Sequence, residues 1–463
     1  MLRKNFLRLG AAVALVTGLA MPPAAADTLT DALILAYRTS PLLEANRAQL
    51  RGLDEEVPQA RALRRPQVEA FGTGSASRRL RSSNAESEFL STGLQTSLRL
   101  YDGGETRAAI ESARATIAAG RADLRATEQI VLFRAVQAYM DVRRDLEFLS
   151  LARNDLRVLE EQLRAALDRF EVGEITRTDV NLTEARLAAS RARLAAAEGA
   201  LEVSRASYLA AVGKLPEDLQ PPPPIPALPS TLEEAMAIAT QRNPDIIAAQ
   251  FAERAAVFDF ERATSARRPQ ISATAEVAWQ DQFETGINTE RRDVAAQAGL
   301  TASVPLYSGG QVSSLIRQAQ TLVEARQSEL QSTARDVREA VAAAWSELEV
   351  ARAQIPARRE QVVAARATAE GFAEEARVGA RSTLDVLDAD QDELEAEADL
   401  VQAERDEYVA AYNLLQAMGL LTVEHLGLGI ETYDPDVYFS RVQSGPTGGE
   451  DRSVLDRIRS RWE

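Results

Sequence analysis

The sequence LRLYDGGE, residues 98–105, returns 206 residues later as VPLYSGGQ at residues 304–311. In both stretches apolar residues lead into a tyrosine, a small polar residue and two glycines. Aspartate and serine are good helix N-caps, and glycines allow the chain to turn sharply. Each stretch therefore predicts a strand that passes directly into a helix.

The expected capping residues stand at matching places in the two stretches. They are Asp102, Gly103, Gly104, Ser308, Gly309 and Gly310. We expect Asp102 and Ser308 to be the N-caps. Glu105 and Gln311 stand three residues further on, where the partner of a capping box reaches back.

The repetition extends far beyond this turn. LTDALILAYRTSP (29–41) matches LEEAMAIATQRNP (232–244), and RRPQV (64–68) matches RRPQI (267–271). Val-Gly and Asp-Val pairs also recur later in the chain at a spacing of 206. Internal repeats of this kind indicate a duplicated architecture. Two units of about 200 residues therefore fill most of the chain.

The first 26 residues have the pattern of a secretory signal peptide, with three basic residues, an apolar run and three alanines before Asp27. Their removal changes the formal charge from −16 to −19, which argues against nucleic acid as a partner. The absence of cysteine from the sequence excludes a disulfide framework and a thiolate metal site. No later apolar run approaches the ~18 to 20 residues of a transmembrane helix, so any membrane segment must consist of strands.

Two long helices are expected, at residues 103–172 and 309–378. Both stretches are rich in Ala, Arg, Glu and Leu, with apolar residues three and four apart. Seventy helical residues extend ~105 Å. In the second helix Pro356 predicts a bend or a local break. Each helix ends at a Val-Gly pair, after which a shorter alanine-rich helix returns, at 179–212 and 385–418.

Two β-hairpins are expected, at about residues 66–101 and 269–307, because apolar and polar residues alternate there. Strands of ~10 residues with one apolar and one polar face fit a membrane barrel with a wet lumen. A half-buried strand of a soluble sandwich alternates in the same way, and the strand pattern alone favours that alternative. The layout favours the barrel. Because ~8 strands is the smallest common barrel, the four strands of one chain must be joined by those of other chains.

The layout and several motifs resemble the TolC family of outer-membrane efflux and type I secretion channels. The motifs are RRPQ, LYxGG, the helix turns EVGEITRTDV (171–180) and RVGARSTLDVLDA (377–389), and the polyproline joint PPPPIPALP (221–229). The resemblance covers about residues 27–425. It implies a mainly α fold with a small β-barrel contribution, in which duplicated long-helix coiled coils and four transmembrane strands per chain build a trimeric α/β-barrel duct.

By this resemblance the protein is a homotrimer, with twelve strands in the outer membrane and helices extending through the periplasm. The implied partners are a periplasmic adaptor, an inner-membrane pump or ABC transporter, and outer-membrane lipid. The chain would divide into a signal peptide (1–26), a first repeat (27–214), a Pro-rich linker (215–230), a second repeat (231–420) and an acidic, partly disordered tail (421–463).

The resemblance places adaptor docking on the turns at the far ends of the long helices. These turns are Val172-Gly173 and Val378-Gly379, and an ordinary helix C-cap also explains their sequence.

Just past the second turn, Asp385 and Asp388 lie three residues apart and hence on one helix face. By the resemblance, these aspartates form acidic rings at a periplasmic constriction. Rings of carboxylates concentrate cations and repel anions. Ser382 and Asp385 also fit a simple capping box, although that reading does not account for Asp388.

The resemblance further implies that Arg381 bonds across to Thr178 or Asp179 and holds the entrance shut. A tyrosine that helps fasten the closed state in well-known members is replaced here by Ala376. The closed state is therefore weaker here, or it is fastened differently.

Catalysis has little support in the sequence. There is no Gly-rich phosphate loop, serine triad or metal-spaced cluster, and the sole histidine, His425, has no counterpart in the first repeat. We expect no enzyme activity, cofactor or metal. Two other classes stay open, a periplasmic coiled-coil scaffold or adaptor and an exported α-helical enzyme. A passive duct takes its specificity from its pump and adaptor, so the sequence does not identify the cargo.

Overall fold

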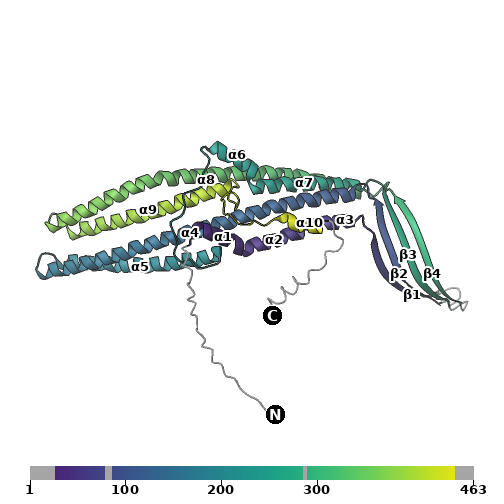
Figure 1. The fold of residues 1–463 in the computed structure, drawn as a ribbon, viewed down its shortest axis with the longest axis horizontal. Coiled ribbons are helices and arrows are strands. Elements are labelled where there is room, and N and C mark those ends of the chain that lie inside the picture. Colours follow the sequence, from purple (N-terminus) through teal and green to yellow (C-terminus); the bar gives the residue numbers. More distant parts are fainter. Residues whose placement is uncertain (1–26, 79–85, 285–288, 444–463) are drawn as a thin grey trace, which may run out of the picture.

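The computed structural model describes residues 27–78, 86–284 and 289–443. The expected signal peptide, residues 1–26, and the last part of the C-terminal tail, residues 444–463, lie outside these ranges. The described chain is a long bundle of helices with a β-sheet at one end (Figure 1). Within those ranges, every helix lacks the combination of length and hydrophobicity that crossing a membrane requires.

The two repeats share one order of elements. The first contains α1 (Leu29–Thr39), α2 (Pro41–Asp54), α3 (Glu56–Ala62), β1 (Gln67–Arg78), β2 (Glu86–Tyr101), α4 (Glu105–Glu171) and α5 (Arg177–Val212). The second contains α6 (Leu232–Arg242), α7 (Pro244–Ser265), β3 (Gln270–Glu284), β4 (Thr289–Ser303), α8 (Gln311–Arg377) and α9 (Thr383–Ala417). A short helix, α10 (Pro435–Val442), follows. In the second repeat α7 takes the place of α2 and α3.

The long helices α4 and α8 run through both halves of the bundle. Each has 67 residues, or about 100 Å of helix. Away from the sheet, α4 pairs with α5 and α8 pairs with α9 as antiparallel hairpins (Figure 1). Toward the sheet, α7 packs against both α4 and α8, whereas α2 and α3 pack on α4. Many buried residues of α4 are alanines, which let the helices approach closely.

The local break predicted at Pro356 is wrong, because α8 continues without interruption through this residue. Proline removes one backbone N–H and so frees the carbonyl group of Arg352, four residues earlier. Both residues are exposed, so water can replace the lost hydrogen bond. The helix therefore tolerates the proline at this position.

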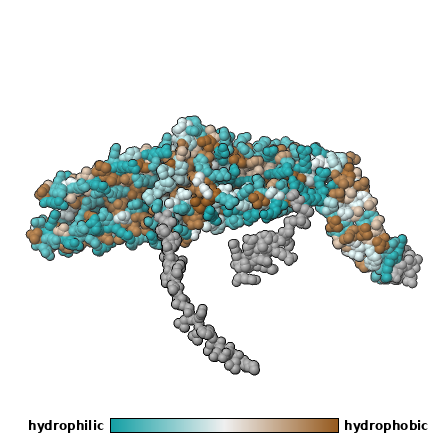
Figure 2. All heavy atoms as spheres, viewed as in Figure 1, coloured by the Kyte–Doolittle hydropathy of each residue, from teal (hydrophilic) through white to brown (hydrophobic). Residues whose placement is uncertain are grey.

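The four strands form one antiparallel sheet in the order β1-β2-β3-β4. On one face Leu94 of β2 lies opposite Val277 of β3, and both are more than half exposed. On the other face Gln297 of β4 donates a hydrogen bond to Glu276 of β3 at 2.8 Å. Figure 2 shows hydrophobic residues over much of the sheet near the helices. Within the described residues, β1 and β4 each keep one unpaired edge.

The turns from strand to helix differ from the sequence prediction in the position of the cap. The N-caps are Gly104 and Gly310, with φ values of 99° and 90°, rather than Asp102 and Ser308. The Asp102 carboxylate still accepts hydrogen bonds from the N–H groups of Gly104 and Thr106, both at 3.1 Å. At the start of α8 the Ser308 hydroxyl accepts one hydrogen bond, from the N–H group of Val312 at 3.4 Å.

The glycines explain this shift. Their left-handed conformation adds a loop between the polar residue and the helix, so the cap moves by two residues. The expected capping box with Glu105 or Gln311 does not form among the described contacts, and Glu105 pairs with Arg99 of β2 at 3.3 Å instead. A side chain at Gly103 would also collide with Arg268, because its Cβ would lie 2.6 Å from the Cβ of that residue.

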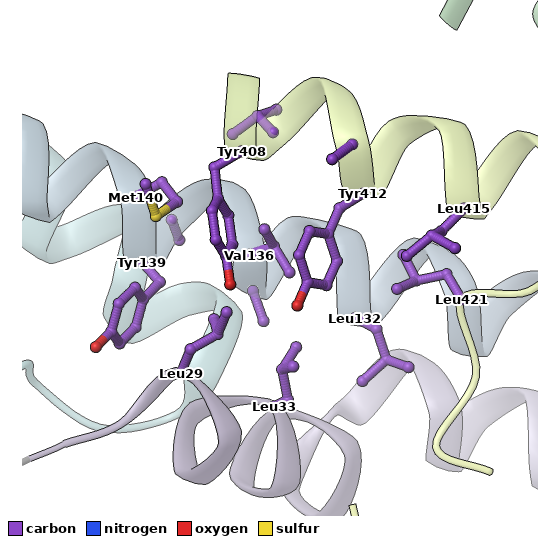
Figure 3. Close-up of a cluster of buried hydrophobic side chains, with 14 of the residues drawn as sticks. Leu29, Leu33, Leu132, Val136, Tyr139, Met140, Tyr408, Tyr412, Leu415 and Leu421 are labelled. Atoms are coloured by element: carbon purple, nitrogen blue, oxygen red, sulfur yellow. The ribbon is translucent and has the colours of Figure 1, made fainter. Parts of the chain in front are cut away.

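The main hydrophobic core lies in the middle of the bundle, where the two repeats meet. Leu29 of α1, Leu132 of α4 and Leu415 of α9 are buried in it. Figure 3 shows Tyr408 and Tyr412 pointing from α9 toward α1, and their rings stack with centroids 5.2 Å apart. Both repeats therefore contribute to one core.

The linker, residues 215–230, passes beside this core. Leu219 pairs with Asp27 in an isolated parallel bridge. The hydroxyl oxygen of Tyr139, which is buried in α4, lies 2.6 Å from the main-chain oxygen of Gln220 and 3.1 Å from that of Asp27. The Asp27 carboxylate also binds the Lys214 ammonium group at 2.7 Å. One tyrosine thus holds the start of α1 and the linker against α4.

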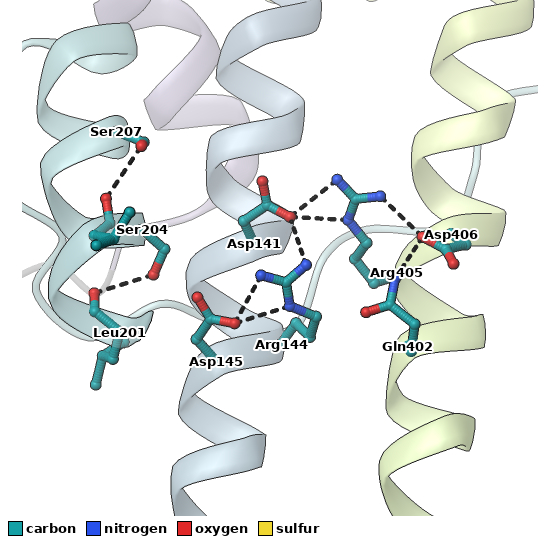
Figure 4. Close-up of polar contacts among 10 residues, drawn as sticks. Asp141, Arg144, Asp145, Leu201, Ser204, Ser207, Gln402, Arg405 and Asp406 are labelled. Atoms are coloured by element: carbon teal, nitrogen blue, oxygen red, sulfur yellow. Dashed lines mark hydrogen bonds and ion pairs between the residues drawn. The ribbon is translucent and has the colours of Figure 1, made fainter. Parts of the chain in front are cut away.

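A charged network joins α4 to α9 next to the core (Figure 4). Arg405 of α9 binds Asp141 of α4 at 2.9 Å and its own neighbour Asp406 at 2.8 Å. Arg144 binds Asp141 at 3.2 Å and the buried Asp145 at 2.8 Å. Buried charges require such partners, and here the partners link one repeat to the other.

A second, smaller core lies between α2, α4 and the C-terminal segment, and it contains a carboxyl group without a partner. Asp54 is fully buried, and neither of its oxygens has a hydrogen-bond partner among the described residues. Burial raises the pKa of Asp54 from 3.8 to about 6, although the Arg121 guanidinium opposes the shift. Asp54 is therefore a source of instability at neutral pH.

We predict that Asp54→Asn stabilises the protein at pH 7 to 8 and that this gain disappears toward pH 4. The folded state favours protonated Asp54, so the wild type loses stability as the pH rises from about 4 through about 6. The gain should be at most about 3 kcal/mol, because a tenfold change in an acid constant corresponds to about 1.4 kcal/mol. Thermal unfolding followed by circular dichroism measures it. Glu198→Gln, at an exposed carboxylate of α5, is the control and should give no such gain.

A second prediction concerns Tyr139→Phe, which removes the hydroxyl group that holds Asp27 and Gln220. We expect a loss of roughly 1–3 kcal/mol in unfolding free energy, because the hydrogen bond that the buried hydroxyl donates to the main chain is lost. Denaturant unfolding provides the measurement, with Tyr307→Phe at an exposed position as the control. Equal stability of the two variants would contradict the role given to Tyr139.

Candidate functional site

The turns between the long and return helices lie together at the end of the bundle opposite the sheet (Figure 1). Val172 and Val378 are the C-caps of α4 and α8, and they are followed by left-handed Gly173 and Gly379. The valine side chains are 71% and 80% exposed. The turns are therefore ordinary helix ends that also present apolar side chains to solvent.

Each return helix starts with a capping box. Thr176 and Asp179 form it at the start of α5, and Ser382 and Asp385 form it at the start of α9. These hydrogen bonds, above all that from the Ser382 hydroxyl, hold the pKa of Asp385 below its usual value. The Thr176 hydroxyl does the same for the pKa of Asp179. Both carboxylates are therefore ionised at neutral pH and already have a structural role.

Asp388 takes no part in the capping box that Asp385 forms. Its carboxylate forms an ion pair with Arg186 of α5, so it links the return helices of the two repeats. The neighbouring residues Leu187 and Leu387 are buried in one small cluster with Leu159 of α4. The ion pair therefore lies at the margin of a packed contact.

Sequence reasoning missed Arg186, although the repeats contain a signal for it. At the spacing of 206, Arg186 corresponds to Asp392 and Asp388 corresponds to Leu182. The charged partners thus stand where the two repeats differ. Positions at which the two repeats carry different residues can therefore point to contacts between the repeats.

A second polar link lies beside this cluster. Gln162 of α4 donates a hydrogen bond to Asp390 of α9, and burial raises the pKa of the Asp390 carboxyl group. Within the first hairpin, Arg193 of α5 binds Asp155 of α4 at 2.8 Å. Near the turns, the two hairpins are therefore joined by one leucine cluster and two polar contacts among the described residues.

Arg381 has different partners from those expected. Its guanidinium binds Glu375 at 2.8 Å and lies 4.0 Å from the centroid of the Phe372 ring. Both partners belong to the end of α8, because the turn folds Arg381 back over that helix. Among the contacts of the described residues, none joins Arg381 to Thr178 or Asp179. The expected fastening contact therefore stays a prediction.

The described residues contain no group of three or more His, Asp or Glu side chains that could hold a metal ion. His425 is exposed, and its backbone N–H group donates to Thr422 at 3.2 Å. The arrangement at the turns thus consists of caps, ion pairs and exposed valines, which can bind a partner or influence passing ions.

Comparison with known proteins identifies relatives over nearly the whole chain. The model of the outer membrane efflux protein family matches residues 33–214 and 236–420. Outer membrane efflux protein BepC of Brucella suis is 36% identical over 436 residues, which cover 94% of this chain and 94% of that protein. Outer membrane protein TolC of Escherichia coli is 25% identical over 425 residues, covering 87% of this chain and 84% of that protein.

A solved structure shows the same fold. The CmeC outer membrane channel of Campylobacter jejuni matches with a TM-score of 0.73 at 16% identity, over 95% of this chain and 98% of that chain. The expected fold class, long duplicated helices with four strands per chain, is confirmed. The matching family consists of transport channels. The chain belongs to the outer membrane efflux protein family, as an exit channel of the outer membrane whose helical part lies in the periplasm.

Proposed function

We propose that three copies of this chain form one duct, which passively conducts cargo from a periplasmic adaptor and an inner-membrane pump to the exterior. The observation that carries this proposal is the layout of the chain. An amphipathic sheet with two unpaired edges lies at one end, exposed helix turns lie at the other, and helices of 67 residues connect them.

The internal duplication supports a closed ring of chains. Within the sheet, the last strand of the first repeat, β2, pairs with the first strand of the second repeat, β3. If the next chain continued this order, β4 would pair with β1 of that chain. In the helical part α7 packs on both α4 and α8, whereas α4 is the one long helix on which its counterparts α2 and α3 pack among the described residues. The same continuation would place α8 of a neighbouring chain against α2 and α3. Three chains and twelve strands complete the barrel in this proposal.

The adaptor would dock on the turns around Val172-Gly173 and Val378-Gly379. Exposed valines on rigid helix ends offer apolar anchor points, and the left-handed glycines fix the shape of each turn. Whether the partner pump exports small molecules or polypeptides depends on proteins other than this chain.

The entrance of the duct would lie just beyond these turns, where Asp385 and Asp388 of three chains come together. Carboxylates in a narrow pore concentrate cations. Asp385 is ionised and half-buried, with its charge fixed by the cap of α9. In this proposal a contact of Arg381 with Thr178 or Asp179 of a neighbouring chain would hold the entrance closed.

We predict that the detergent-extracted protein forms small, cation-selective channels in planar bilayers and that Asp385→Ala with Asp388→Ala removes this selectivity. The carboxylates supply the local negative potential, so their loss removes the preference for cations. Reversal potentials in a salt gradient measure it. The control is Glu198→Ala with Glu202→Ala, which removes two exposed carboxylates of α5 far from the turns.

Selectivity that survives the double aspartate change would leave the duct in place and return both aspartates to structural roles. Folded protein that forms no channels at all would overturn the duct and favour a periplasmic scaffold or adaptor.

A further prediction concerns adaptor docking. Val172→Glu with Val378→Glu should reduce crosslinking to the adaptor at least about tenfold, because an apolar anchor is replaced by a charge that must be desolvated. Crosslinking in cells expressing the cognate adaptor measures the loss. Val203→Glu, at an equally exposed valine of α5 away from the turns, should crosslink as the wild type does. Unchanged crosslinking of the double variant would place docking elsewhere.

A further inference from the structure

We propose that Arg186 determines the ion selectivity of the entrance, because it neutralises Asp388 for as long as α5 and α9 stay in contact. This inference rests on the proposed channel entrance. In the arrangement described, each chain then contributes one uncompensated aspartate, Asp385, to the entrance. Separation of α5 from α9 would add a second uncompensated aspartate, Asp388.

The pair is held by its surroundings. Arg186 and Asp388 come from different repeats, and the residues next to them, Leu187 and Leu387, are buried against Leu159. The leucines therefore set the distance between the two helices. The Arg186 and Asp388 side chains are 33% and 53% exposed, so the pair lies at the surface of this contact, where its charge affects passing ions.

An ion pair and a free carboxylate act differently on an ion in the pore. A carboxylate in contact with a guanidinium is close to a dipole, whose field weakens more steeply with distance than that of a charge. Salt screens both, over about 10 Å at 0.1 M ionic strength. The effect of releasing Asp388 should therefore be greatest at low salt.

The contact is also placed to respond to movement. Near the turns, the hairpin of α4 and α5 meets that of α8 and α9 at the leucine cluster, at Gln162 with Asp390, and at this ion pair. Farther up the bundle, the network of Asp141 and Arg405 ties α4 to α9. A motion that parts α5 from α9 while that network stays intact must break Arg186 from Asp388. Widening of the entrance and gain of negative charge are thus one event.

The test compares reversal potentials of Arg186→Gln, Asp388→Asn and the two changes together in planar bilayers at low salt. Arg186→Gln frees Asp388, so the preference for cations should rise by roughly twofold or more. Asp388→Asn alone should change selectivity little, since its charge is already compensated. In the combined variant, Asp388→Asn should cancel the rise caused by Arg186→Gln.

The matched control is Arg193→Gln. Arg193 lies two turns along the same face of α5 and pairs with Asp155 inside the first hairpin, so its loss changes the net charge equally without releasing Asp388. It should leave selectivity unchanged. The exchanged pair, Arg186→Asp with Asp388→Arg, restores the contact and should behave as the wild type even if Arg186→Gln assembles poorly.

Two results would overturn the inference while the channel stands. One is wild-type selectivity in Arg186→Gln, and the other is a loss of selectivity in Asp388→Asn alone as large as that in Asp385→Asn. A wild-type protein that forms no channels would instead refute the proposed function itself.

Discussion

The packing of α4 against α9 is the contact on which the rest of the molecule depends. Here large apolar side chains from both repeats, such as Leu132 and Leu415, share one core. Elsewhere along α4 many of the buried residues are alanines, whose burial stabilises less than that of larger side chains. Tyr139 and the linker close the core on one side, and the Asp141–Arg405 contact lies next to it. The hairpins are firmly joined at this level and only lightly joined near their turns.

Because the chain is duplicated, the contact between its first and second repeats can also form between the second repeat and the next chain. Within one chain the step from the first repeat to the second pairs β2 with β3 and places α7 between two long helices. Within the described residues, the outer edges of β1 and β4 lack the strand partner that β2 and β3 give each other. The proposed ring of identical chains would pair both edges.

The number of acidic residues does not by itself set the charge at the turns. Asp179 and Asp385 have equivalent capping roles, as expected from equivalent positions in two repeats. Asp388 has a basic partner that only the other repeat supplies. Functional asymmetry in a duplicated chain therefore arises where the repeats differ, and this is also where one repeat touches the other.

The sequence by itself determined the elements and their order, because the relevant signals are local. Glycine pairs, alternating strands and alanine-rich helical stretches act over a few residues, and the repeat displays each of them twice. It also contained the capping box of Ser382 and Asp385, whose members are three residues apart. Tertiary structure decided the rest. Pro356 is tolerated because its side of α8 faces water, and Asp388 meets Arg186 because α5 packs on α9. These residues are 202 positions apart, and such distant contacts depend on the packing of whole helices, which no local pattern specifies.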